Sequence, residues 1–159
     1  MQPRVSVIIR DCQGADQAKA CLEAMLGQSE KSMELLCLER TSHEEAVRVF
    51  QEYEKKDPRV RSMASWREEA GAGGKSSPVV QGKYVYLPEA SYRIETDFLE
   101  QAVLALERDR AEVALMGEHQ KSLPPYTPFR HWQIAESVFR AVTPWLRQKV
   151  FSAEFLERE

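Results

Sequence analysis

A short β-branched run near the start of the chain limits the possible folds more than any other feature. Val5–Ile9 is apolar except for one serine, and it ends at a polar cluster that begins with Arg10. A strand that is buried on both faces of a parallel sheet has such a sequence, and a polar loop follows its carboxyl end. From Asp16 to Gly27 the apolar residues recur at helical spacing. The pattern therefore predicts a buried strand followed by a helix.

The alternation of strand and helix continues in the following segments. Met33–Leu38 predicts a second strand and Val60–Met63 a third. Between them, Ser42 is expected to cap a helix that ends at Asp57 and Pro58, because proline cannot continue a helix. A β-α-β-α-β order predicts a parallel sheet with right-handed crossovers and helices on its faces.

The rest of the chain has a less regular pattern. Residues 65–78 are rich in glycine, serine and proline and predict a flexible loop. The elements expected beyond this loop are a strand at Tyr84–Leu87, a helix capped by Thr96, a strand at Glu112–Met116, a helix at Phe129–Ala141, a short strand or turn from Thr143, and a helix from Ser152.

Size, charge and hydropathy limit the class of protein. A chain of 159 residues fits one ordinary domain. Its 22 basic and 25 acidic side chains give a net charge of −3. Because phosphate contacts need a concentrated basic surface, this balance argues against nucleic-acid binding. No stretch approaches the roughly 18 apolar residues of a membrane span, and the opening run is too short for a secretory signal. We therefore expect a cytoplasmic protein without a membrane span.

The three cysteines have a spacing that matches neither a C-x-x-C metal site nor an even-numbered disulfide framework. They are Cys12, Cys21 and Cys37. We expect all three to be small buried apolar side chains.

Segments spread over nearly the whole chain occur in the order found in one known enzyme family. They are Val5–Ile9, Cys21–Ser29, Glu34–Leu38, Phe50–Val60, Gly82–Tyr86, Glu95–Glu100 and Pro144–Leu156. Together they resemble family 2 glycosyltransferases. The resemblance implies a three-layer α/β/α, Rossmann-like domain of the type-A glycosyltransferase architecture (GT-A), with a mostly parallel central sheet. It also implies one domain over residues 1–159, in which 1–91 form a nucleotide-binding-like half and 92–159 a remainder with a truncated acceptor side.

The resemblance implies the transfer of a sugar from a nucleotide donor to a hydroxyl group, in polysaccharide or glycoconjugate synthesis. In this family an acidic pair after the second strand contacts the nucleotide, and a D-x-D motif holds a divalent metal on the diphosphate. The hard cation needs carboxylate oxygens and neutralises the leaving nucleotide diphosphate as the glycosidic bond forms.

The residues at the matching positions of this chain depart from that pattern. Glu39 keeps the first acid of the pair, but Arg40 reverses the charge of the second. Glu89 and Ser91 match the two acids of D-x-D, so one carboxylate is lengthened and the other is a neutral hydroxyl. Arg10 stands where the family usually has proline. The chain ends before the later acidic motif that commonly supplies the general base, so we assign no catalytic residue.

These departures favour a degenerate member of the family. We interpret the chain as a pseudoenzyme with weak or no activity alone, whose candidate nucleotide-sugar-binding residues are Arg10, Glu39, Arg40, Glu89 and Ser91. Glu89 is the weak candidate for a metal ligand. No cofactor is expected, and Mn²⁺ or Mg²⁺ would be needed only if the domain is active.

Three alternatives stay open. Arg10 and Arg40 could together hold a diphosphate without a metal, which would give an unusual active transferase. The domain could also be a non-catalytic module that binds or docks on an active glycosyltransferase. In the third alternative the chain is a fragment, and its continuation supplies the base.

Overall fold

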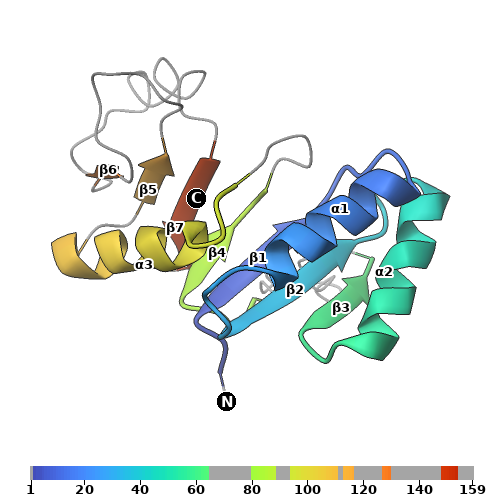
Figure 1. Cartoon of the computed structure of the whole chain (residues 1–159), viewed down its shortest axis with the longest axis horizontal. Helices are drawn as coiled ribbons and strands as arrows, with labels where there is room; N and C mark the ends of the chain where they lie inside the picture. Colours follow the sequence, from blue (N-terminus) through green and yellow to red (C-terminus); the bar gives the residue numbers. More distant parts are fainter. Residues whose placement is uncertain are drawn as a thin grey trace, which may run out of the picture.

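The computed structural model describes residues 2–64, 80–88, 94–110, 113–116, 127–129 and 148–153. Figure 1 shows strands that alternate with helices in the first half of the chain. The elements are β1 (Val5–Ile9), α1 (Ala15–Leu26), β2 (Met33–Leu38), α2 (Glu44–Lys56), β3 (Val60–Met63), β4 (Tyr84–Tyr86), α3 (Phe98–Asp109), β5 (Val113–Met116), β6 (Thr127–Phe129) and β7 (Gln148–Ser152). The chain is an α/β domain, as the sequence predicts.

The strands form one sheet in the order β3-β2-β1-β4-β7-β5-β6. β3, β2, β1 and β4 are parallel, which confirms the predicted parallel sheet. β7 pairs antiparallel with both β4 and β5, and β6 pairs antiparallel with β5. Within the parallel part, Ile9 is opposite Cys37 and Val7 is opposite Tyr86. The carboxyl ends of β1, β2 and β4 therefore lie along one edge of the sheet.

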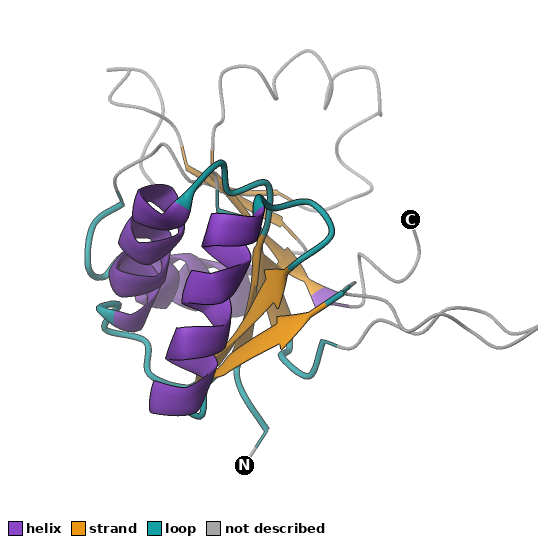
Figure 2. Ribbon diagram, turned by 90° about the vertical axis from the view of Figure 1, so that its right-hand side faces the viewer, coloured by secondary structure: helices purple, strands orange, loops and turns teal. Residues whose placement is uncertain are grey.

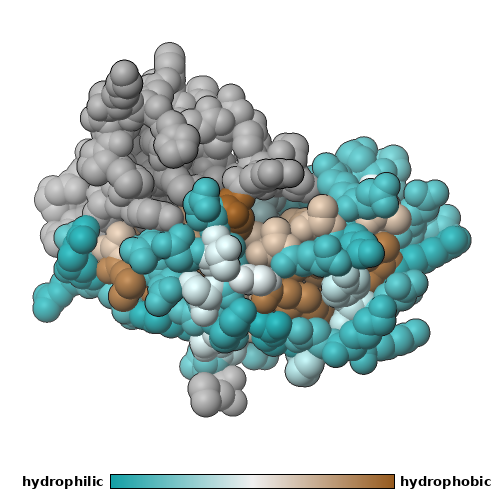
Figure 3. Space-filling model, in the orientation of Figure 1, coloured by the Kyte–Doolittle hydropathy of each residue, from teal (hydrophilic) through white to brown (hydrophobic). Residues whose placement is uncertain are grey.

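The described helices α1, α2 and α3 pack on one face of this sheet (Figure 2). Alternate residues of β1, namely Val5, Val7 and Ile9, point to this face and are almost fully buried. They share a core with Leu22 of α1 and Phe50 of α2, among others. Since strand residues alternate between faces, Ile8 belongs to a smaller cluster on the other side. Hydrophilic side chains cover most of the described part of the outer helical surface (Figure 3).

Two predicted helix caps are wrong, and the reason is the same for both. His43, not Ser42, is the residue before α2, and the Ser42 hydroxyl instead accepts a hydrogen bond from the Cys12 N–H at 3.2 Å. Asp97, not Thr96, precedes α3. Neither helix has a side-chain cap from its own preceding residue. At both helices a contact from elsewhere in the chain takes part: the Ser42 hydroxyl binds the Cys12 N–H, and the Leu99 N–H of α3 donates to the Gln28 side chain.

The second half of the chain needs further corrections. Phe129 lies in β6, not at the start of a helix, because it pairs with Val113 of β5. Ser152 ends β7, because it pairs with Tyr84 of β4, and Ala153 is already helical, so the helix expected from Ser152 begins one residue later than predicted. The short strand or turn expected from Thr143 onward includes β7. The rest of the two expected helices and the expected loop at 65–78 lie outside the described residues. No helix among the described residues is long and apolar enough to cross a membrane.

A buried polar cluster fixes the start of β4 against the middle of the sheet. The Ser6 hydroxyl donates to the Glu34 carboxylate and accepts the N–H of Gly82 at 2.8 Å. The same carboxylate accepts the N–H of Gln81 at 2.7 Å and lies 3.5 Å from the Arg61 guanidinium. Because buried polar groups are stable only when they are hydrogen-bonded, these contacts hold the chain before β4 in one position.

This close approach predicts that Gly82→Ala destabilises the domain. A Cβ atom at Gly82 would lie 2.5 Å from the Ser6 nitrogen and 2.7 Å from the Val5 carbonyl carbon, so the main chain would have to shift. We expect urea denaturation to show a loss of about 2 kcal/mol or more in the free energy of unfolding. Gly14→Ala is the control, because the nearest atom to its added Cβ is 3.9 Å away. Equal stability of the two variants would contradict this account of the packing.

Candidate functional site

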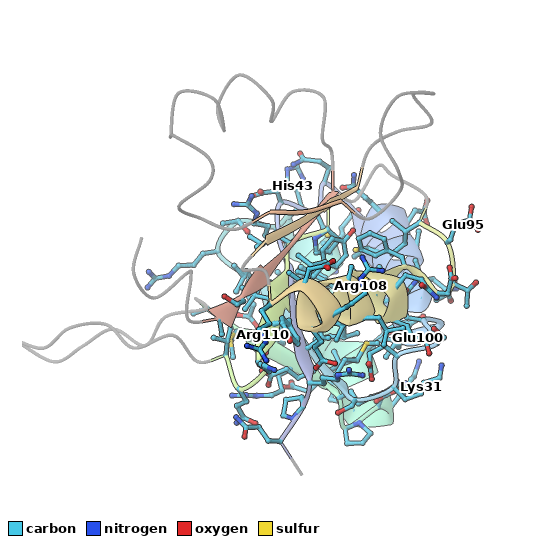
Figure 4. All side chains as sticks on the ribbon, turned by 90° about the vertical axis from the view of Figure 1, so that its left-hand side faces the viewer. Lys31, His43, Glu95, Glu100, Arg108 and Arg110 are labelled. Atoms are coloured by element: carbon cyan, nitrogen blue, oxygen red, sulfur yellow. The ribbon has the colours of Figure 1, made fainter. Side chains whose placement is uncertain are left out.

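The loops that follow β1 and β2 are joined into one surface at the carboxyl edge of the sheet. The Asp11 N–H donates to the Thr41 hydroxyl at 3.1 Å, and the Cys12 N–H donates to the Ser42 hydroxyl. In the reverse direction, the His43 N–H donates to the Cys12 carbonyl at 2.9 Å. Figure 4 shows His43 at this edge. The two loops therefore hold each other in place without a ligand.

Arg10 and Asp11 form the exposed tip of the first loop. The Arg10 guanidinium lies 3.6 Å from the Asp11 carboxylate, and both side chains are at least half exposed. An ion pair of this kind contributes little stability because water screens it. Asp11 has a φ of 57°, a left-handed conformation that is uncommon outside glycine but tolerated by aspartate. The hydrogen bond from its N–H to Thr41 helps to hold this conformation.

Glu39 follows β2 and turns toward β3 and α2. Its carboxylate accepts a hydrogen bond from the Ser62 hydroxyl at 2.7 Å and a weaker one from the Gln51 amide at 3.4 Å. Its N–H donates to the Met63 carbonyl at 2.9 Å, which completes the last pair of β2 and β3, Leu38 with Met63. One oxygen of the Glu39 carboxylate is thus engaged within the protein. The next residue, Arg40, is exposed.

Of the five candidate binding residues, three lie on this joined surface. Arg10, Glu39 and Arg40 follow neighbouring strands, and the register of β1 and β2 places their main chains side by side. Glu89 and Ser91 lie outside the described residues. They follow β4, which is also parallel to β1 and ends at the same edge. Ser62, Gln51 and the hydroxyls of the second loop were not predicted, because only the folded chain brings them to Glu39 and to the first loop.

Charges of both signs are mixed at this edge. Arg10 lies beside Asp11 in the first loop, and Glu44, in the acidic first turn of α2, is paired with Arg48. Within the part of the chain that the structure describes, no group of three or more histidine, cysteine or acidic side chains could hold a metal ion. The described surface is therefore neither a concentrated anion site nor a cluster of carboxylates.

The thiol of Cys12 lies beneath this surface. All three cysteines are free and buried, which confirms their predicted role as small apolar side chains. Burial, reinforced by the negative charge of Asp11, raises the pKa of Cys12 to about 11, and burial raises the pKa of Cys21 to about 12. Burial likewise raises the pKa of Cys37. Because the thiolate is the reactive form, none of these groups is a ready nucleophile at neutral pH.

The architecture is similar to that of solved glycosyltransferases. The mannosyltransferase PcManGT from Pyrobaculum calidifontis, solved with GDP-Man and Mn²⁺, aligns with a TM-score of 0.65 at 17% identity, over 99% of this chain and 47% of that chain. TarS 1–349 from S. aureus aligns with a TM-score of 0.62 at 14% identity, over 98% of this chain and 48% of that chain. The same protein in complex with UDP-GlcNAc gives a TM-score of 0.56 at 15% identity, with 98% and 47% covered.

This chain has a glycosyltransferase fold. It spans about half of the length of these solved structures. No family model and no curated protein matches its sequence. At these identities the likeness establishes the glycosyltransferase fold alone, and the chemistry of the site has to be argued from the residues of this chain.

The raised pKa of Cys12 predicts a loss of stability at alkaline pH. The folded state favours the neutral thiol, so its stabilising effect is complete below the ordinary pKa of the thiol and is lost as the pH rises toward the folded value. Urea unfolding of the wild type should therefore give a free energy that falls more steeply between pH 9 and pH 11 than that of Cys12→Ser, which cannot titrate. Parallel pH profiles of the two proteins would show that the folded state does not raise this pKa.

Proposed function

We propose that this chain is a family 2 glycosyltransferase-like domain with a degenerate donor site, which has weak or no transferase activity on its own. The glycosyltransferase fold supports the general class, a domain related to enzymes that use nucleotide-sugars. The solved relatives were bound to GDP-Man with Mn²⁺ and to UDP-GlcNAc. The family resemblance of the sequence supports the same class of donor for the ancestor of this chain.

The observation that carries the proposal is the charge of the turn after β2. The family resemblance places an acidic pair here, whereas this chain has Glu39 followed by Arg40. Glu39 is partly committed to Ser62 and Gln51. The exchange of an anion for a cation changes the local charge by two units. At about 6 Å from a neighbouring charge, each unit is worth about 1 to 3 kcal/mol for an effective dielectric constant between 80 and 20. Because a cation at this position repels a divalent metal ion, the change is large enough to weaken metal-dependent donor binding by orders of magnitude.

The metal that the family implies does not fit the matching residues. A hard divalent cation binds to several carboxylate and carbonyl oxygens. At the D-x-D position this chain offers the carboxylate of Glu89 and the neutral hydroxyl of Ser91. With half of the ligand charge missing, we expect no resident Mn²⁺ or Mg²⁺, and we assign no chemical step to a metal.

A metal-free transferase is the second candidate function, and one observation favours it. Arg10 and Arg40 follow neighbouring strands, in two loops that hydrogen bonds hold together, so the chain carries two guanidinium groups at one edge of the sheet. Guanidinium groups bind diphosphates well. The nearby acids oppose this function, because Asp11 lies beside Arg10 and Glu39 precedes Arg40.

Restoration of the lost charges should create a metal-dependent nucleotide site. We predict that isothermal titration of the wild type with UDP shows no Mn²⁺-dependent binding at millimolar nucleotide. The variant Arg40→Asp/Glu89→Asp/Ser91→Asp should bind UDP at least about tenfold more tightly in the presence of Mn²⁺, because each ligand charge contributes a kilocalorie or more. The gain should disappear when a chelator is added.

The control is Lys55→Asp, which reverses a charge on the exposed surface of α2, away from the strand ends. Mn²⁺-dependent binding of UDP by the wild type, abolished by Glu89→Ala, would contradict the proposal and indicate an active donor site. Metal-independent binding that is lost in Arg10→Ala and Arg40→Ala would favour the second candidate. A folded restored variant without any gain would show that the missing charges are not what disables the site.

A further inference from the structure

We infer that Gln28 is a positioning residue that caps α3 from outside the helix and fixes the chain that returns from the donor motif. This inference builds on the proposed function in one respect only, the role of the motif at Glu89–Ser91. Gln28 lies in the turn after α1 and is only 1% exposed. A polar side chain that is so deeply buried needs partners for both its donor and its acceptor.

Both ends of the Gln28 amide are hydrogen-bonded to the chain around the start of α3. Its oxygen accepts the N–H of Leu99 at 3.0 Å, and its nitrogen donates to the carbonyl of Glu95 at 2.9 Å. These partners are 71 and 67 residues away in the sequence. The side chain therefore bridges the segment before α3 and the first turn of the helix.

The bond to Leu99 replaces the missing N-terminal cap. The first N–H groups of a helix have no acceptor within the helix, and a capping side chain usually supplies one. Asp97, the residue before α3, makes no such bond with its side chain. Leu99 is the second residue of α3, the position whose N–H a capping residue commonly binds. Gln28 thus performs this capping function from another part of the chain.

Ser29, the residue after Gln28, adds two hydrogen bonds between the turn after α1 and the start of α3. The Ser29 N–H donates to the carbonyl of Thr96 at 2.8 Å, and its hydroxyl donates to Glu100 at 2.6 Å. Glu95 and Glu100 lie at the amino end of α3, and Arg108 and Arg110 at its carboxyl end (Figure 4). The turn after α1 therefore binds the chain at four points around the start of α3.

The segment that is fixed in this way begins at Glu95, four residues after Ser91, the last residue of the motif. Phe98, the first residue of α3, packs against Tyr86, the last residue of β4, with ring centroids 5.0 Å apart. The motif at Glu89–Ser91 lies in sequence between these two residues. Gln28 holds the chain on one side of the motif, and the pairing of β4 with β1 holds it on the other.

Amide exchange measured by NMR tests this role directly. The Leu99 N–H has no acceptor inside the helix and donates to the Gln28 side chain, so its protection depends on Gln28. Gln28→Ala should make this amide exchange about tenfold faster or more, and the amides of β1 and β2 should be unaffected. Gln28→Glu should keep the protection of Leu99, because a carboxylate still accepts that N–H. It should, however, loosen the segment at Glu95, because the donor is lost.

Gln17→Ala is the matched control, since the Gln17 side chain accepts the N–H of Gln13 at the other end of α1. Gln17→Ala should speed up the exchange of the Gln13 amide and leave the Leu99 amide protected. Unchanged protection of Leu99 in Gln28→Ala would overturn the inference, whatever the nucleotide-binding data show.

A second readout separates positioning from general stability. In the charge-restored variant, Gln28→Ala should weaken Mn²⁺-dependent UDP binding about tenfold at a temperature where the protein remains folded, and Gln17→Ala should not weaken it. Equal affinities with and without Gln28→Ala would limit Gln28 to a structural cap and overturn its positioning role. If the restored variant binds no UDP, only the proposed function fails, because the exchange experiment needs no nucleotide.

Discussion

The parallel pairing of β1 with a strand on each side is the constraint on which the rest of the described structure depends. β1 lies between β2 and β4, and its residues are almost completely buried. Both pairings run in the same direction, so the loops after three strands reach one edge of the sheet. A shift of register by one residue would turn Val7 and Ile9 away from the helices, at a cost of several kilocalories per mole. The position of the candidate site is therefore a consequence of core packing.

The charged residues of the candidate site are not part of the hydrophobic core. Arg10 and Arg40 are exposed, and the hydrogen bonds that join their loops use main-chain groups and the hydroxyls of Thr41 and Ser42. A change of charge at either arginine therefore leaves the loop contacts and the core intact. This separation allows the glycosyltransferase fold to be kept while the charges at this edge of the sheet vary.

Local periodicity was sufficient to predict the first half of the fold. β1, β2 and β3 have the predicted bounds. β1 and β2 are buried at every residue, and such mainly apolar runs are hard to confuse with polar helices. The caps were predicted wrongly because their hydrogen bonds cross the chain. The Ser42 hydroxyl accepts a hydrogen bond from the loop after β1, and the Gln28 side chain accepts one from the first turn of α3. β6 was missed for a similar reason, since its strand conformation depends on antiparallel pairing with β5 and not on its own sequence.

The candidate site was predictable in position and less so in detail. The ends of parallel strands meet at one edge, so Arg10 and Glu39 could be placed together from the strand pattern alone. The engagement of Glu39 by Ser62 and Gln51 could not, because nothing in the local sequence of β3 or α2 marks those side chains as its partners. Hydrogen bonds between side chains of different elements follow from tertiary packing, which periodicity does not describe.

We propose that the candidate donor site lacks the negative charge needed to hold a metal-bound nucleotide. Paramagnetic line broadening in an NMR spectrum of the whole chain, recorded with UDP-GlcNAc and Mn²⁺ and compared with Mg²⁺, tests this claim at the level of residues. We predict weak broadening spread over the exposed acidic side chains. Strong broadening confined to the amides of Leu87, Ile94 and Glu39, which flank the donor motif and the turn after β2, would contradict it.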